Sequence, residues 1–160
     1  MENYAPFWKR AAALVVDLMI VTTVLVTVLV AFWPLISVLI WVLNPILTMV
    51  VGAEAARHAL LLVLKIVWST VVLVLPVALY GFYFARMESS TLQGGVGKLF
   101  FGLRVVDAEG QRLTLEKAWW RYFNKLLSAL TLGIGFAMAG FTEKKQALHD
   151  LMTGTFVLNK

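Results

Sequence analysis

The sequence predicts an all-α membrane protein with two transmembrane helices, a third membrane segment and a small cytoplasmic β-hairpin. Hydrophobic residues make up 61% of the 160 residues and charged residues only 14%, whereas soluble domains are roughly half apolar and about a quarter charged. Two apolar stretches are also long enough to cross the ~30 Å hydrocarbon layer of a bilayer, which takes about 20 helical residues. These observations exclude a water-soluble globule.

The two transmembrane helices are expected at residues 11–33 and 66–85 of a single-domain chain. The first carries one charged residue, Asp17. The second contains Pro76, which a spanning helix tolerates because neighbouring groups can satisfy the freed carbonyl. The first apolar run is too long for a cleavable signal peptide and no Ala-x-Ala-like site follows it, so we expect an uncleaved anchor.

The segment between these helices, residues 35–65, is predicted to stay on the outer side as an interfacial or re-entrant element. Asn44-Pro45 breaks a helix locally in its first part, 35–52. Short cytoplasmic loops collect Lys and Arg. Lys9 and Arg10 precede the first helix, and seven more basic residues lie between the second helix and the segment 126–141: Arg86, Lys98, Arg104, Arg112, Lys117, Arg121 and Lys125. Both groups lie in the cytoplasm only if an even number of crossings separates them, which places the N-terminus inside.

The cytoplasmic loop, residues 86–115, is predicted to contain a β-hairpin. Two short β-branched runs, 103–107 and 111–115, flank a turn that ends in Gly110. The terminal run 155–158 is a further short strand that could pair with the hairpin. Thr114 is the expected N-cap of the next helix, with Glu116 in its first turn.

Residues 116–141 are predicted to form an amphipathic helix followed by the third membrane segment. Its aromatic residues beside basic ones suit the level of the lipid headgroups, and the expected interface anchors are Trp8, Trp119, Trp120 and Tyr122. The bilayer and its anionic headgroups are therefore the expected partners, and nucleic acid is not. Residues 126–141 either cross once or fold back. We favour the fold-back because glycines suit a tight reversal, which leaves the tail 142–160 in the cytoplasm.

Asp17 is the most informative residue, because a helix that enters at residue 11 carries it ~9 Å into the hydrocarbon. An ionised carboxylate at the centre of a bilayer costs ~2.5–3.5 kcal/mol, and somewhat less nearer the edge. Arg10 lies two turns earlier on the same face and is the expected partner, with a second partner from another element. A structural ion pair is the favoured interpretation and a proton- or cation-handling carboxylate the alternative. With the fold-back, Asp150 also comes near Arg10.

Three separated blocks of sequence resemble the RDD family of bacterial membrane proteins. The blocks are Phe7-Trp8-Lys9-Arg10 leading to Asp17, Gly97-Lys98-x-x-x-Gly102-Leu-Arg-Val-Val-Asp107, and Ala147-Leu-His149-Asp150-x-x-x-Gly154-Thr155. The resemblance covers residues 4–158, and Val96 departs from it where family members commonly carry proline. The family is named for an arginine and two aspartates, which correspond to Arg10, Asp17 and Asp150. The resemblance implies a multi-pass protein of the bacterial cytoplasmic (inner) membrane with about three membrane segments. It implies little about activity, although transport, including sodium/proton exchange, has been suggested for some members.

We therefore expect a non-enzymatic membrane module, a homo-oligomer or the partner of another membrane protein, whose Arg/Asp/Asp cluster ties the helices together. The alternative is a small oligomeric ion transporter or cation/proton exchanger in which Asp17 binds the ion. Further candidates for ion pairing or for lining a pathway are Lys98, Arg104, Arg121, Lys125 and His149. No catalytic residue, cofactor or metal is expected, since cysteine is absent and the two histidines have no metal-ligand spacing.

Overall fold

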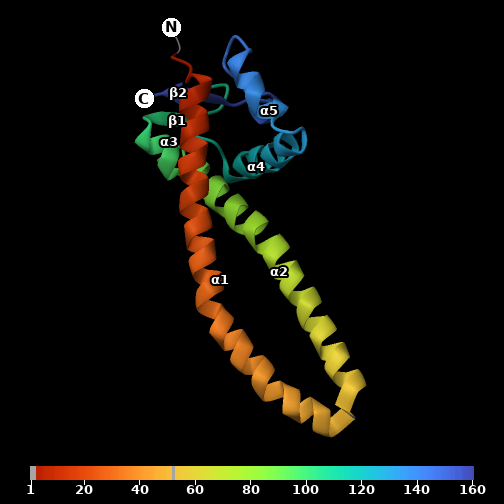
Figure 1. Cartoon of the computed structure of the whole chain (residues 1–160). Coiled ribbons are helices and arrows are strands. Elements are labelled where there is room, and N and C mark those ends of the chain that lie inside the picture. Colours follow the sequence, from red (N-terminus) through yellow and green to blue (C-terminus); the bar gives the residue numbers. More distant parts are fainter. Residues whose placement is uncertain (1–2, 52) are drawn as a thin grey trace. The chain divides into compact units, whose positions relative to one another are not determined.

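The computed structural model describes residues 3–51 and 53–160, most of them helical (Figure 1). The helices are α1 (Phe7–Val51), α2 (Ala53–Ser89), α3 (Val96–Phe100), α4 (Leu115–Leu130), α5 (Ile134–Ala137), the 3-10 helix η1 (Met138–Gly140) and α6 (Leu148–Thr153). The strands are β1 (Leu103–Val106) and β2 (Phe156–Asn159). The chain divides into two compact units, which we call the apolar unit (Thr22–Ala78) and the ionic unit (residues up to Val21 together with Leu79–Lys160).

The two predicted membrane helices are confirmed as elements. Within the described residues, two helical stretches are long and apolar enough to cross a membrane, Phe7–Val50 and Arg57–Ser89. A third candidate exists only if α4 and the stretch Ile134–Gly140, which are bent by 114° at the break between them, are taken as one span. Whether that third segment enters the membrane stays a prediction.

The predicted end of the first helix at Pro34 is wrong. Helix α1 runs without a break through Pro34 and Pro45 for 45 residues. Each proline removes one N–H from the helix, but an unwound segment in lipid would leave many backbone groups without partners, because lipid offers none. Continuing the helix is therefore the smaller cost. Gly52, the end of the segment 35–52, lies outside the described residues.

The apolar unit exposes large hydrophobic side chains along both of its helices. Trp41 is 78% exposed, Met49 91% and Leu73 72%. Contiguous apolar surface of this extent is untypical of a soluble monomer. Trp33 and Trp68, one from each helix, meet edge to face with ring centroids 5.6 Å apart. This unit therefore suits a surrounding of lipid.

The ionic unit contains a two-stranded sheet whose partner strand differs from the predicted hairpin. Strand β1 pairs antiparallel with β2, and Val105 lies opposite Val157. The run 111–115 forms no strand. Thr114 accepts the N–H of Lys117 at 3.2 Å and caps the start of α4, as predicted. Because α4 begins so soon after the turn that ends in Gly110, little chain is left there for a second strand. Strand β2, and not residues 111–115, is therefore the partner of β1.

Both described ends of the chain belong to the core of the ionic unit. The buried apolar residues at its centre come from the first segment, β1, α4 and β2, and include Ala5, Leu103, Val105, Ala118 and Val157. The N–H of Ala5 donates to the carbonyl of Val157 at 2.9 Å. This pairing holds the N-terminal segment against β2. The same segment continues into α1, whose first turns carry Lys9 and Arg10.

Candidate functional site

Asp150 links three helices through its carboxylate. It lies in the first turn of α6, fully buried, where Oδ2 accepts the N–H of Ala147 at 3.0 Å and so caps the helix. Arg10 of α1 donates to Oδ2, and Arg121 of α4 donates to Oδ1. Two of the three residues that resemble the family signature, Arg10 and Asp150, are thus in direct contact.

Glu88 is a second buried carboxylate, at the end of α2, and it was not predicted from the sequence. Its Oε2 lies 2.6 Å from Nη1 of Arg121, and its Oε1 lies 2.7 Å from Nζ of Lys125 and 2.5 Å from Nζ of Lys98. One signal could have found it, because Glu88 is the only acidic residue between Glu54 and Asp107. It follows a long apolar run in a region rich in lysine and arginine.

Arg121 joins the two carboxylates. Its side chain is 1% exposed and contacts Glu88 through one edge and Asp150 through another, while Nε also donates to Oγ1 of Thr155 at 3.1 Å. The planar guanidinium fork allows such simultaneous contacts. We call the resulting set the ionic network; its members are Arg10, Glu88, Lys98, Arg121, Lys125 and Asp150. A buried pair of this kind destabilises strongly when one partner is removed.

Asp17 lies outside this network. It is fully buried, and Oδ1 accepts the N–H of Gly97 at 2.8 Å and the hydroxyl of Tyr83 at 2.6 Å. Among the described residues no ion pair to Asp17 is found, and Oδ2 has no hydrogen-bond partner. The expected partner, Arg10, is instead directed to Asp150 and to the carbonyl of Lys145. The three signature residues therefore form one ion pair and one separate carboxylate.

Two glycines allow α3 to approach Asp17 and α1. A Cβ at Gly97 would lie 2.1 Å from the carbonyl oxygen of Ala13, and a Cβ at Gly95 would lie 2.5 Å from the carboxylate oxygens of Asp17. No real side chain tolerates such distances to backbone or to a buried charge. The sequence Gly95-Val96-Gly97 thus has a steric role, namely close contact with the first helix.

The remaining candidates for ion pairing differ in whether they lie at the ionic network. Nε2 of His149 lies 3.5 Å from Oδ1 of Asp150, and Nδ1 lies 3.4 Å from Oγ of Ser128. Lys98, Arg121 and Lys125 belong to the network. Arg104 is exposed on β1 and is not among the network's partners in the described part of the chain.

The four predicted interface anchors differ in exposure. Trp8 is 79% exposed and Trp120 is 60% exposed, as rings at a headgroup layer would be. Trp119 is partly buried against the core of the ionic unit. Tyr122 is buried, and its ring would lie 2.7 Å from a Cβ at Gly81. Tyr122 as an outward-facing anchor is therefore wrong, because the glycine on α2 makes room for the ring inside.

Burial and neighbouring charges displace several pKa values in the ionic network and in His149 beside it. Burial alone would raise the pKa of Asp150, but the guanidinium groups of Arg121 and Arg10 outweigh it and hold that pKa below its ordinary value. Burial lowers the pKa of His149 well below its usual value, which keeps the ring neutral. Burial also lowers the pKa of Lys98, and that of Lys125 to about 7, although Glu88 opposes both shifts.

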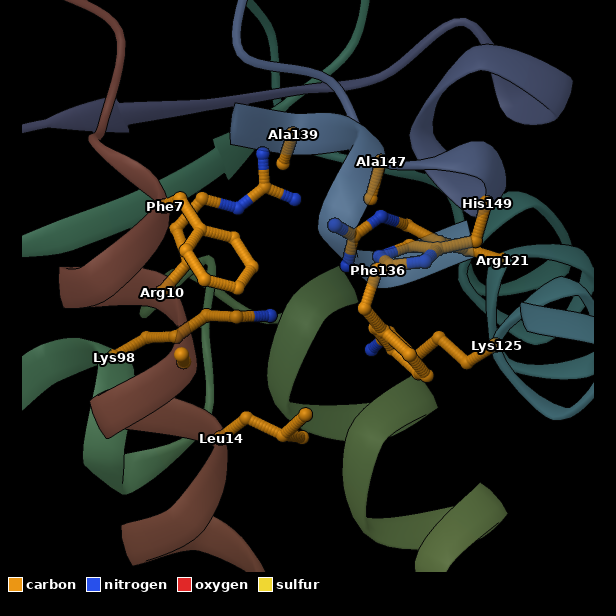
Figure 2. Close-up of a pocket in the computed structure, with 11 residues that line it drawn as sticks. Phe7, Arg10, Leu14, Lys98, Arg121, Lys125, Phe136, Ala139, Ala147 and His149 are labelled. Carbon is orange, nitrogen blue, oxygen red and sulfur yellow. The ribbon is translucent and has the colours of Figure 1, made fainter. Parts of the chain in front are cut away.

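A cavity of about 110 Å³ lies beside the network within the ionic unit (Figure 2). Its walls combine apolar side chains, among them Phe7, Leu14 and Phe136, with cationic ones from the network. In the described part of the chain, no three His, Asp or Glu side chains are grouped as a metal ion would require.

Comparison with known proteins supports one family. The model of the RDD family matches residues 4–154. The Bacillus subtilis (strain 168) protein described as "Uncharacterized protein YxaI" is 40% identical over 78 residues, which cover 49% of this chain and 51% of that protein. The chain thus spans about half the length of this curated relative. No solved structure matches. Because the family model covers nearly the whole sequence, this chain belongs to the RDD family.

Proposed function

We propose that this RDD-family membrane protein is a non-enzymatic module of the bacterial cytoplasmic membrane, in which the ionic network locks the ionic unit together. The observation that supports the proposal most directly is the placement of Asp150, whose carboxylate is shared by Arg10 of α1 and Arg121 of α4. Glu88 extends the same network to the end of α2. Each charged side chain of the ionic network contacts an opposite charge, as a structural lock requires.

The surroundings of Ser128 and His149 argue for a non-enzymatic role. A serine beside a histidine and an aspartate is the arrangement of a nucleophile and its base. Here Ser128 is fully buried and its hydroxyl donates to the carbonyl of Asn124 at 2.9 Å, so its proton is not directed to the histidine. Ser128 is also not among the residues that line the cavity. A substrate carbonyl would find no approach to this oxygen.

The proposal places the N-terminus in the cytoplasm and crosses the membrane twice. The hydrogen bond from Ala5 to Val157 supports this topology, because segments from the two ends of the chain must then lie on one side. The concentration of Lys and Arg before α1 and after α2 favours the inner side.

The same topology implies that residues 126–141 fold back rather than cross. Gly133 adopts a φ of +83° between α4 and α5, a conformation that glycine accepts without strain. Leu130 is 80% exposed and Leu132 is 95% exposed at this reversal. An apolar tip of this kind suits the boundary between headgroups and acyl chains. We propose that it contacts the bilayer, while the exposed rings of the apolar unit face lipid or a further membrane helix, such as one from a second copy.

The proposal is tested with the wild type and an Asp150→Asn variant, purified and reconstituted in vesicles. We expect the variant to lose yield and melting temperature because two guanidinium groups lose their shared charge. An exposed carboxylate, Glu54, supplies the matched control Glu54→Gln. Sodium- or pH-gradient-driven flux should remain at background for all three proteins. Flux in the wild type that a folded Asp17→Asn variant lacks would overturn the proposal in favour of an exchanger.

A further inference from the structure

The residues that line the cavity beside the ionic network include several cations and no acidic residue, although carbon atoms form most of its surface. Among its eleven lining residues are four cations, Arg10, Lys98, Arg121 and Lys125, and neither Glu88 nor Asp150 is one of them. Figure 2 shows these side chains reaching into the space from different segments of the chain. The two carboxylates of the network bind the cations without facing the cavity.

The cations of the network exceed its carboxylates. Four basic side chains share two carboxylates, so positive charge is in excess when all four are protonated. Because the pKa of Lys125 is lowered to about 7, this lysine carries only part of its charge at neutral pH. Lys98 and Lys125 both contact the same oxygen, Oε1 of Glu88, and within the described residues no second oxygen acceptor is found for either ammonium group. Both groups also face the ring of Phe84, with Nζ of Lys98 6.0 Å and Nζ of Lys125 4.3 Å from its centroid. An ammonium group has three N–H donors. Donors therefore remain for an anion, and an anion would offset the buried excess charge.

The size of the cavity restricts what it can hold. Its volume of about 110 Å³ is well above the ~15 Å³ that one water needs. It is below the roughly 300–1,000 Å³ of pockets that enclose whole drug-sized ligands. A single tetrahedral oxyanion fits this range better than a nucleotide does. The apolar side chains Phe7, Leu14 and Phe136 leave room for the carbon part of an ester beside the cations.

We propose that this cavity binds a phosphoryl group, either as the headgroup of an acidic lipid or as a free phosphate. Lysine is a point-charge binder of phosphate, and the arginine fork matches its oxygens. Trp8, on the first turn of α1 and 79% exposed, is typical of a residue at the headgroup layer. The site goes beyond the structural lock, because the network makes its ion pairs without a ligand.

The first experiment measures the melting temperature of the full chain in nanodiscs. The probes are phosphatidylglycerol in phosphatidylcholine discs, and inorganic phosphate added to discs of phosphatidylcholine alone. We expect a saturable rise of about 5–10 °C when the ligand exceeds its Kd a hundredfold. A rise with both probes identifies free phosphate as sufficient, and a rise with the lipid alone identifies a headgroup. No rise with either probe would overturn the proposal.

A pair of neighbouring substitutions separates the cavity from general attraction to basic surfaces. Leu14→Trp fills the cavity without removing a charge, whereas Val15→Trp places the same ring on the exposed side of α1, where Val15 is 54% exposed. We expect Leu14→Trp to lose the rise and Val15→Trp to keep it. An equal rise in both variants would contradict binding in the cavity.

If Leu14→Trp does not fold, the smaller substitution Ala11→Leu, at another cavity-lining residue, replaces it. The wild type alone also provides a test by 31P NMR. A bound phosphoryl group should broaden or shift the phosphorus resonance of the effective probe at substoichiometric protein. An unchanged resonance for both probes would contradict the proposal without any variant.

Discussion

Polar side chains find their partners in different ways in the apolar unit and in the ionic unit. In the apolar unit, hydroxyl groups bond their own helix, as Ser69 does with the carbonyl of Lys65 at 2.6 Å, and the side chains remain exposed. In the ionic unit, Asp17, Glu88 and Asp150 are fully buried and are held by partners from other segments. The stability of the apolar unit should depend on the lipid around it, whereas the stability of the ionic unit should depend on contacts among its own side chains. Substitutions should therefore have small effects in one unit and large effects in the other.

The largest contrast is expected between two glutamates. Glu88→Gln removes the charge that three cations share, and breaking a buried pair of this kind costs about 3–5 kcal/mol. Glu54→Gln, in the apolar unit, should change stability by less than about 0.5 kcal/mol. Unfolding by denaturant in mild detergent measures both. Equal effects of the two substitutions would remove the distinction between the units.

A second contrast sharpens the account of close packing within the ionic unit. Gly97→Ala would bring a Cβ to 2.1 Å from the carbonyl of Ala13, and overpacking of this kind costs about 1–3 kcal/mol. Gly140→Ala meets nothing within 4 Å and serves as the control. We expect a lower melting temperature for the first variant and an unchanged one for the second. A stable Gly97→Ala protein would show that α3 does not need to approach α1 so closely.

The pH dependence of stability should arise from the ionic unit. Burial lowers the pKa of His149, so below about pH 6.5 the unfolded chain binds a proton that the folded chain does not. Stability should then fall with decreasing pH, by up to about 1.4 kcal/mol per pH unit for this one proton. Asp150 adds a loss in the same direction below about pH 4, since its pKa is also lowered in the folded state.

The control for this dependence is the second histidine. His149→Gln should flatten the slope between pH 6.5 and pH 5, whereas His58→Gln should leave it unchanged because His58 is exposed in the apolar unit. Melting temperatures over this range provide the measurement. A slope that persists in His149→Gln would assign it to another group.

The smallest effect is expected for the hydroxyls of the apolar unit. Ser69→Ala removes a bond to the same helix and should change stability by less than about 0.5 kcal/mol. The melting temperature in nanodiscs checks this expectation. A loss as large as that of Glu88→Gln would mean that this serine has a partner outside its own helix.

Local signals in the sequence were sufficient for the two long helices and for the Thr114 cap, because each depends on neighbouring residues alone. The continuation of α1 through Pro34 was missed because proline opposes a helix locally while lipid favours one over the whole segment. The partner of β1 was misassigned because the actual strand, β2, lies fifty residues further along the chain. Pairing over such a distance leaves no local pattern.

The candidate site was predicted in part for the same reason. Arg10 and Asp150 were found through the resemblance to a family signature, and the structure joins them. Glu88 was missed because its burial results from cations on α3 and α4, which its own surroundings in the sequence do not reveal. Asp17 was expected beside Arg10, and its close approach to Gly95 and Gly97 was not expected.

The most direct test of the account is a pair of double-mutant cycles that share Arg10→Gln. One cycle combines it with Asp150→Asn, and the other combines it with Asp17→Asn. We predict a coupling free energy of about 1–3 kcal/mol for Arg10 with Asp150 and near zero for Arg10 with Asp17, measured by denaturant unfolding. A large coupling between Arg10 and Asp17, with none to Asp150, would contradict the network described for this protein.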